Sequence, residues 1–185
     1  MFTALSASPS GRGLWGFTNR GRVVVRGDAR LQRSGSLTDL VGIDLQGPIL
    51  DSVVTPGGDG YYMLGADGGV FTFGAASFDG SLPGLGVVPN EPAVGLVPDP
   101  DGEGYWIVAA DGGVFGFRAP FQGSLPGVLG GAVLNAPIAG MVTYGDGYLQ
   151  VATDGGVFNF SSSPFLGSLG NNPPDDPIVA ISPVG

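Results

Sequence analysis

Short runs of alternating apolar and small or polar residues recur along this chain, separated by glycine and aspartate. The clearest example is Gly-Tyr-Trp-Ile-Val-Ala-Ala-Asp-Gly-Gly-Val-Phe-Gly-Phe at residues 104–117. Asp-Gly between two such runs is the strongest short-range signal for a β-hairpin, and it favours a turn whose two central residues both have φ > 0. In the second run, Phe115 and Phe117 fall on one face of the strand. Residues 104–117 are therefore predicted to form a hairpin.

The same motif occurs at residues 60–73 and 147–160, so the chain is a repeat protein. The turn aspartates Asp67, Asp111 and Asp154 are 44 and 43 residues apart. Each of these repeats opens with a proline and a short apolar strand, where the missing N–H of proline costs no ladder hydrogen bond. After the hairpin, each repeat has a Phe-x-Gly-Ser-Leu segment, which we interpret as a fourth, outer strand.

The repeat boundaries divide the chain into five segments that we expect to form one domain. They are a diverged first repeat (1–47), repeat 2 (48–91), repeat 3 (92–136), repeat 4 (137–176) and a closing strand (177–185). Four short strands in about 44 residues is the size of a β-propeller blade. We predict an all-β, β-propeller-like array of four repeats with about four short antiparallel strands each, enough for a compact four-bladed ring. The paired phenylalanines are expected to fill the space between neighbouring blades.

The two ends of the chain complicate this count. In the first repeat, Asn-Arg-Gly at residues 19–21 replaces Asp-Gly-Gly, and Ser-Gly-Ser-Leu at residues 34–37 is the expected counterpart of the later Gly-Ser-Leu. Residues 177–183 resemble one more opening strand, although residues 2–5 already supply one. The closing strand either completes the first blade as a clasp, displacing residues 1–8, or pairs with another chain, since exposed strand edges favour pairing.

Composition narrows the classes of partner. The formal net charge is −9 and the pI is about 4.1, which argues against a nucleic-acid partner. No apolar stretch approaches the length of a membrane span, so no membrane insertion is expected. The N-terminus lacks the basic segment and apolar run of a signal peptide, so secretion by a standard N-terminal signal is not expected.

Arginine is concentrated at the start of the chain, where six of the seven basic residues precede residue 34. These arginines either solvate an atypical terminal repeat or form a docking surface for an acidic neighbour, such as the acidic C-terminal part of another copy. The candidate interface residues are Arg20, Arg22, Arg26, Arg30 and Arg33.

Residue types argue against catalysis. The chain has no histidine and no cysteine, which removes Ser-His-Asp and Cys-His systems and the imidazole and thiolate metal sites. A glycosidase needs only two carboxylates, but most acids here fall in turns, where aspartate bonds its own backbone. The acidic loop at residues 99–104 begins like an EF-hand loop but has Ala110 where the twelfth-position glutamate belongs. We predict a non-enzymatic protein with no cofactor and no metal.

Aromatic residues at the central strands are the candidate ligand or partner contacts. They either stack on sugars, one platform per blade, or are buried between blades. Adjacent aromatics on a strand point to opposite faces, so one of Tyr105 and Trp106 is expected to pack while the other is presented. The candidates are Trp15, Tyr61, Tyr62, Tyr105, Trp106 and Tyr148.

The pattern Gly-Tyr-Trp-x-Val-Ala-x-Asp-Gly-Gly-Val-Phe-x-Phe, followed by Phe-x-Gly-Ser, resembles a repeat found in actinobacterial cell-surface proteins and in minor tail proteins of phages that infect actinobacteria. The resemblance is strong across residues 48–185 and weak across residues 1–47. It implies propeller-like β structure and a role in adhesion or scaffolding.

Two functions follow from this resemblance. The leading one is a virion structural protein of the tail or tail tip, assembled in the host cytoplasm, which docks to other tail proteins or copies of itself and contacts the host surface. The alternative is a glycan-binding module of an actinobacterial envelope protein at the cell surface, with cell-wall glycan as its ligand.

Overall fold

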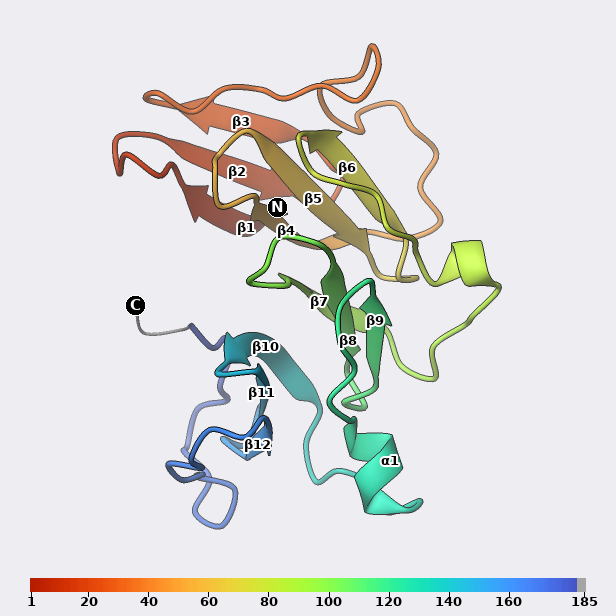
Figure 1. Cartoon of the computed structure of the whole chain (residues 1–185), viewed down its shortest axis with the longest axis vertical. Coiled ribbons are helices and arrows are strands. Elements are labelled where there is room, and N and C mark those ends of the chain that lie inside the picture. Colours follow the sequence, from red (N-terminus) through yellow and green to blue (C-terminus); the bar gives the residue numbers. More distant parts are fainter. Residues whose placement is uncertain (183–185) are drawn as a thin grey trace. The chain divides into compact units, whose positions relative to one another are not determined.

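The computed structural model describes residues 1–182 and contains four three-stranded antiparallel sheets, here called blades 1 to 4 (Figure 1). Within each blade the strands follow chain order, and each blade lies inside one predicted repeat. The strands are β1 (Phe2–Ala7), β2 (Leu14–Thr18) and β3 (Val23–Arg26) in blade 1; β4 (Ile49–Val54), β5 (Gly60–Gly65) and β6 (Val70–Gly74) in blade 2; β7 (Ala93–Pro98), β8 (Tyr105–Ala109) and β9 (Val114–Phe117) in blade 3; and β10 (Ile138–Tyr144), β11 (Gly147–Ala152) and β12 (Val157–Phe160) in blade 4.

Helical structure among residues 1–182 is limited to the 3₁₀ turn η1 (Pro83–Leu85) and the short helix α1 (Leu125–Leu129). The prediction of an all-β chain built from four repeats is therefore confirmed. The chain forms two compact units, each holding two blades: blades 1 and 2 lie in Met1–Val88, and blades 3 and 4 lie in the unit that begins at Pro89.

The predicted fourth strand is wrong, because each blade has three strands. The Phe-x-Gly-Ser-Leu segments, at residues 78–82, 121–125 and 165–169, are return segments in which the final leucine donates its N–H to a glycine carbonyl in the hairpin of its own blade. The N···O distances are 3.2 Å in blade 2, 3.2 Å in blade 3 and 2.9 Å in blade 4. The glycine of each segment has φ between 123° and 135°, which interrupts an extended strand.

The hairpin turns also differ from the prediction. In blade 3, the N–H of Gly112 donates to the carbonyl of Ala109, and the N–H of Ala109 donates to the carbonyl of Gly113, both at 2.9 Å. Gly112 has φ of 79°, whereas Asp111 does not have positive φ. This is a three-residue loop, a type I turn followed by a left-handed glycine, rather than a turn with two positive φ values. The Asp111 carboxylate stabilises it by accepting the N–H of Gly113 at 2.8 Å.

The first repeat uses a different leucine from the one that the sequence suggests. The N–H of Leu40 donates to the carbonyl of Gly21 at 2.9 Å, in the same way as the later return leucines, and Leu40 is buried. Leu37 is exposed and is bridged locally to Ser34. The expected equivalence of residues 34–37 with Gly-Ser-Leu is therefore wrong, because this repeat reaches its hairpin through a longer loop.

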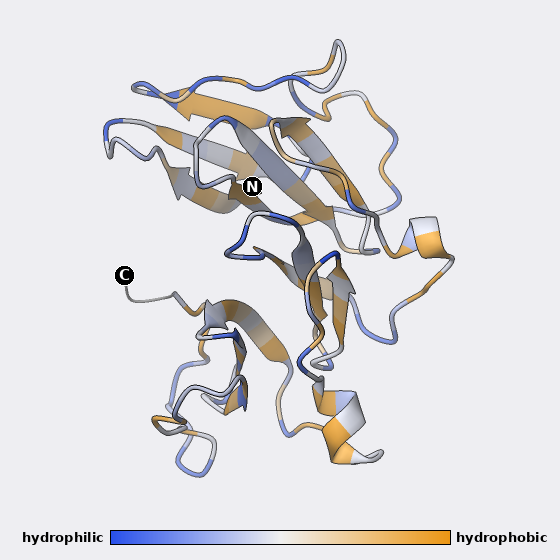
Figure 2. Cartoon of the chain, viewed as in Figure 1, coloured by the Kyte–Doolittle hydropathy of each residue, from blue (hydrophilic) through white to orange (hydrophobic). Residues whose placement is uncertain are grey.

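Blades 1 and 2 share an apolar core (Figure 2 shows apolar bands along their strands). Phe17 of β2 meets Tyr61 of β5 edge to face at a centroid distance of 5.3 Å, and Tyr61 stacks on Phe73 of β6 at 5.0 Å. Aromatic pairs of this kind contribute about 0.5–1.5 kcal/mol beyond their area burial. The opening strand of blade 2 is tied to blade 1 because the N–H of Ile49 donates to the carbonyl of Asn19 at 2.9 Å.

Blades 3 and 4 repeat this arrangement in their own core. Trp106 of β8 meets Tyr148 of β11 edge to face at 5.4 Å, and Tyr148 lies beside Phe160 of β12 at 5.8 Å. The N–H of Ile138 donates to the carbonyl of Ala110 at 2.8 Å. In both units, phenylalanine of the third strand fills the space next to the preceding blade, as the repeat pattern predicts.

One buried polar residue interrupts the core of blade 4. Gln150 is fully buried, its Nε2 donates to the carbonyl of Gly112 at 3.2 Å, and its Oε1 has no hydrogen-bond partner among residues 1–182. The same register position holds Met63 in blade 2 and Ile107 in blade 3.

We expect Gln150→Met to raise the free energy of unfolding by about 1 kcal/mol. It removes a buried acceptor whose desolvation costs about 1–3 kcal/mol, while the lost bond to Gly112 contributes about 1 kcal/mol. Urea unfolding measures the change, and Gln46→Met at an exposed glutamine is the control, expected within about 0.5 kcal/mol of the parent. A destabilised Gln150→Met would show that the bond to Gly112 outweighs the unpaired oxygen.

The predicted closing strand does not form in the described part of the chain. Residues 177–182 belong to no sheet, and residues 183–185 lie outside the described residues. The N–H of Ile178 nevertheless donates to the carbonyl of Thr153 at 2.9 Å, in the way that Ile49 and Ile138 open their blades.

Candidate functional site

The aromatic candidates are packing residues. Their side chains are all buried, with exposed fractions of 6% or less: Trp15, Tyr61, Tyr62, Tyr105, Trp106 and Tyr148. The indole N–H of Trp106 donates to the carbonyl of Pro120 at 2.9 Å, and that of Trp15 donates to the carbonyl of Arg30 at 2.8 Å. The polar atoms of both indoles are thus engaged within their own unit.

The expectation that one of Tyr105 and Trp106 is presented to solvent is wrong. Trp106 faces blade 4, and Tyr105, on the other face of β8, lies 5.5 Å from Phe117. Both faces of a central strand are packing surfaces, so the alternation that separates the two rings buries both of them. No stacking platform for a sugar remains at these six positions.

The hydroxyls of Tyr61 and Tyr148 connect blades 2 and 4 to the loop of the preceding blade in the same unit. Tyr61 donates its hydroxyl hydrogen to the carbonyl of Thr38 at 2.8 Å. Tyr148 donates to the carbonyl of Gly123 at 2.6 Å and accepts the N–H of Gln122 at 3.2 Å. Burial raises the pKa of Tyr61 to about 12, and the nearby Asp39 carboxylate acts in the same direction.

We expect stability to fall steeply between pH 10 and pH 12. Because the pKa of folded Tyr61 lies above its ordinary value of 10.0, the folded chain holds this proton more tightly than the unfolded chain. Stability linked to the neutral phenol is therefore complete below pH 10 and is lost as the pH rises through 12. Tyr61→Phe should flatten this fall while costing about 1 kcal/mol at pH 7. Urea midpoints measured from pH 7 to pH 12 test this, and an unchanged alkaline slope in Tyr61→Phe contradicts it.

Sequence reasoning missed a set of exposed phenylalanines. Each of the three later return segments presents its phenylalanine to solvent, with exposed fractions between 55% and 60%: Phe78, Phe121 and Phe165. The available signal was the recurrence of phenylalanine at one place outside the alternating strands. A large, mostly exposed apolar side chain at the same place in all three later repeats indicates a surface contact.

The five candidate arginines are all exposed, and two of them line a hollow in blade 1. This hollow has a volume of about 670 Å³, and its wall combines Arg20 and Arg22 with the exposed side chains of Val41 and Ile43. A mixture of guanidinium groups and apolar side chains suits an acidic protein surface.

Blade 3 has the equivalent hollow, of about 420 Å³, but there the wall carries Glu91 and Asp111. Arg20 occupies the turn position that Asp111 holds in blade 3. The N–H of Gly21 donates to the carbonyl of Thr18, just as the N–H of Gly112 donates to the carbonyl of Ala109. The charge of this position is therefore inverted in the first repeat.

Blade 1 also has an exposed apolar sheet face, which we call the free face. It carries Phe2, Leu5 and Leu14, with exposed fractions of 55%, 71% and 41%. A Cβ atom on Gly16 would lie 2.7 Å from the ring of Phe2 and 3.4 Å from Leu5, so these side chains cover the centre of that face.

The residues of this face differ from those of the other blades. Leu14 corresponds to the buried tyrosine of the later repeats, and its partner on β3 is Arg26, where the later repeats have phenylalanine. The Tyr–Phe pair of the later repeats is thus replaced in blade 1 by a leucine and an exposed arginine. Arg26 is the candidate arginine that belongs to the free face.

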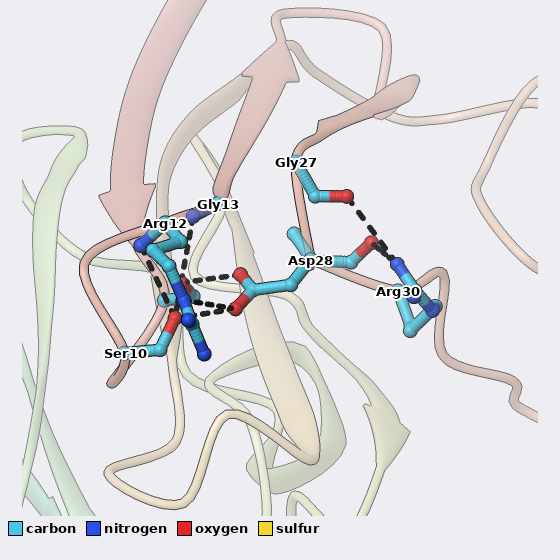
Figure 3. A network of polar contacts seen from close by, with 8 residues as sticks. Ser10, Arg12, Gly13, Gly27, Asp28 and Arg30 are labelled. Atoms are coloured by element: carbon cyan, nitrogen blue, oxygen red, sulfur yellow. Dashed lines mark hydrogen bonds and ion pairs between the residues drawn. The ribbon is translucent and has the colours of Figure 1, made fainter.

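The carboxylate of Asp28 has a structural role in blade 1 (Figure 3). The hydroxyls of Ser10 and Ser8 donate to it, and the guanidinium Nε of Arg12 lies 3.8 Å away. These hydrogen bonds, from Ser10 first and Ser8 second, lower the pKa of Asp28 below its ordinary value. The network holds the β1–β2 turn against the segment after β3.

Arg30 bonds the backbone in the same region, with its guanidinium donating to the carbonyls of Gly27 and Ala29 at 3.4 and 3.0 Å (Figure 3). Of the candidate arginines, Arg30 is thus held by its own loop, whereas Arg20, Arg22 and Arg26 border the hollow or the free face.

Aspartate carboxylates in the turns accept hydrogen bonds from nearby backbone N–H groups. In the loop at residues 99–104, the carboxylate of Asp101 accepts the N–H of Glu103 at 2.8 Å. Residues 1–182 contain no group of three or more histidine, cysteine or acidic residues placed to hold a metal ion. In the same part of the chain, no helix has the length and apolar character needed to cross a bilayer.

Comparison with known proteins identifies the class of fold. No family model and no curated protein matches the chain. Among solved structures, it is similar to a chain in the crystal structure of a mitotic checkpoint complex, with a TM-score of 0.60 and 15% identity over 97% of this chain and 54% of that chain. It is also similar to the β-propeller domain of Cps50 (Swd1) from Myceliophteria thermophila, with a TM-score of 0.51 and 14% identity over 84% of this chain and 50% of that one.

These likenesses show the fold alone: the chain is an array of β-propeller blades. It spans about half the length of each of the two structures.

Proposed function

We propose that the chain is a non-enzymatic structural protein that docks to other proteins, and that it is a minor tail or tail-tip protein of a phage that infects actinobacteria. The observation that carries the docking role is the combination, in blade 1, of an exposed apolar face with exposed arginines. A chain with 43% hydrophobic residues has enough of them for its cores, yet it leaves Phe2 and Leu5 uncovered. Such a patch is typical of a protein interface.

The phage assignment rests on the repeat resemblance, and the fold is compatible with it. One structural neighbour is a chain of a mitotic checkpoint complex, which is consistent with protein partners for a chain of the same fold. On this proposal the chain resides in the virion tail after assembly in the host cytoplasm.

Immunogold labelling of virions tests the assignment. Antiserum raised against the purified chain is applied to particles from a culture that carries the gene. Label at one end of the tail supports the proposal. Particles without label, combined with label on the host cell surface, would contradict it.

The exposed phenylalanine of each return segment favours one alternative, a glycan-binding module of an actinobacterial cell envelope. In that case the purified chain sediments with cell-wall preparations and is released by soluble cell-wall glycan. The triple change Phe78→Ala, Phe121→Ala and Phe165→Ala should abolish binding, since stacking on sugar C–H faces needs the rings. The control is Val128→Ala, which removes an exposed apolar side chain from α1 without changing a return-segment ring.

A further inference from the structure

The segment at residues 177–182 resembles β1 position by position. Ile178 bonds blade 4 as Ile138 bonds blade 3, and Ile138 holds the same register position in its sheet as Phe2 holds in blade 1. On this alignment Ile178 corresponds to Phe2, Ile181 to Leu5, and Ala180 and Ser182 to an identical alanine and serine in β1. The chain therefore carries two versions of one inner strand, one at each end of the repeat array.

The segment already lies where the inner strand of a following blade belongs. The N–H of Ile178 donates to the carbonyl of Thr153 in the hairpin of blade 4, as Ile138 does to Ala110 in the hairpin of blade 3. Further along, Ile181 lies beside β10, with its Cγ2 3.5 Å from a Cβ position on Gly140. In the other unit, β1 lies against β4, so contact between successive inner strands is the rule. The segment is thus docked on blade 4 but belongs to no sheet.

Blade 1 offers the sheet that this segment lacks. In that blade, β1 contributes Leu5 opposite Gly16 of β2 and Ala4 opposite Phe17. The corresponding residues of the segment are Ile181 and Ala180, which place an apolar side chain over Gly16 and a small one beside the buried Phe17. The segment therefore satisfies the same register requirements on β2 as β1 does.

The charges of the two ends are complementary. Residues 1–47 contain six arginines and three aspartates, whereas residues 137–182 contain four aspartates and no basic residue. Asp175 and Asp176 directly precede the segment, and Arg26 lies on the free face of blade 1. Opposite charges at the two ends favour head-to-tail association over association of like ends.

We propose that copies of the chain join head to tail by strand exchange, with residues 177–182 of one copy pairing with β2 of the next copy in place of its own β1. The exchanged strand, β2 and β3 then form a shared blade next to blade 4 of the donor. This buries the free-face residue Leu14 against the donor, and that burial favours the joined form because the strand pairings are otherwise equivalent. The inference rests on the docking function proposed above and names its partner.

Light scattering over a range of concentrations tests the exchange on the purified chain, whatever its location in a virion or on a cell. The full chain is expected to form multiples of 18.6 kDa. A chain ending at Asp176 cannot donate and should be monomeric, and Leu14→Glu in the full chain cannot accept and should also be monomeric. A 1:1 mixture of the two variants should restore a dimer, because each supplies what the other lacks.

Arg26→Glu provides a second acceptor variant at an exposed position that leaves the core unchanged. It should weaken association at least about tenfold, since each 1.4 kcal/mol changes an equilibrium constant tenfold. The control is Arg33→Glu, which makes the same charge change away from the free face, where the carbonyl of Arg33 accepts the N–H of Gly74 in blade 2. This variant should associate like the parent.

Two results overturn the proposal. A full chain that remains at 18.6 kDa at all concentrations indicates that the segment acts within one copy, as in closure of a four-bladed ring. Association that persists in the chain ending at Asp176 indicates another interface. Neither result bears on the virion assignment, which the immunogold experiment decides.

Discussion

Trp106→Ala is expected to lower the free energy of unfolding by about 3–5 kcal/mol. The side chain is 2% exposed, its ring meets Tyr148 of the next blade edge to face at 5.4 Å, and its N–H bonds the carbonyl of Pro120. Truncation leaves a cavity in the core shared by blades 3 and 4 and removes the hydrogen bond to the Pro120 carbonyl. Urea or thermal unfolding measures the loss. It is monitored by far-UV circular dichroism, which does not require the tryptophan that the variant lacks.

Phe121→Ala is the matched control for this experiment. It also removes a large aromatic side chain from the same unit, but its ring is 60% exposed, so a change of no more than about 0.5 kcal/mol is expected. A Trp106→Ala chain as stable as the Phe121→Ala chain would show that Trp106 is not a packing residue. It would also reopen the assignment of this ring to ligand binding.

Gly112→Ala is expected to destabilise the chain by about 2–5 kcal/mol, through two separate effects. The φ of 79° costs an alanine about 1–2 kcal/mol. In addition, the new Cβ would lie 2.4 Å from Cδ1 and 2.8 Å from Cβ of Leu125, and 2.9 Å from Oε1 of Gln150. Because Leu125 is buried and cannot turn away, overpacking adds about 1–3 kcal/mol.

Gly102→Ala isolates the backbone effect. Gly102 has φ of 80°, and a Cβ there meets nothing within 4 Å. This variant should therefore lose only about 1–2 kcal/mol. Equal losses in Gly102→Ala and Gly112→Ala, measured by urea unfolding under identical conditions, would mean that the return leucine adjusts without cost.

The difference between these two glycines shows how the repeat is organised. Gly68, Gly112 and Gly155 all have positive φ, and in each case a Cβ would approach a return leucine within 3 Å. The glycine after the turn aspartate thus has two roles, because it adopts the left-handed conformation and leaves space for the leucine. The Asp-Gly dipeptide alone predicts the left-handed conformation. The need for space depends on a leucine 13 or 14 positions later, which no local pattern indicates.

The predicted features that the structure confirms are those that depend on local pattern and period. The recurrence of Asp-Gly-Gly with alternating apolar residues was sufficient to predict hairpins, four repeats and an all-β chain. The predictions that proved wrong depend on pairing at a distance. A Phe-x-Gly-Ser-Leu segment reads as a strand, but its glycine has φ above 120°, and only one backbone bond joins its leucine to the hairpin.

The first repeat illustrates the same limit. Ser-Gly-Ser-Leu at residues 34–37 matches the motif in letters, yet Leu40 takes the position on Gly21. The leucine that packs on Gly21 is the one that the loop after β3 brings to it. The Gly-Ser-Leu motif does not fix the length of that loop. The structure therefore decides between Leu37 and Leu40.

The candidate site shows most clearly which features depend on local sequence and which depend on contacts between distant residues. The repeat period, the hairpins, the strand alternation, and the separation of six arginines at one end from acidic residues at the other follow from residue order alone. The burial of both Tyr105 and Trp106, the exposure of Phe121 and the apolar face of blade 1 became known only from the folded chain. The physical reason is that alternation assigns a residue to a face of its sheet, whereas burial depends on what packs against that face.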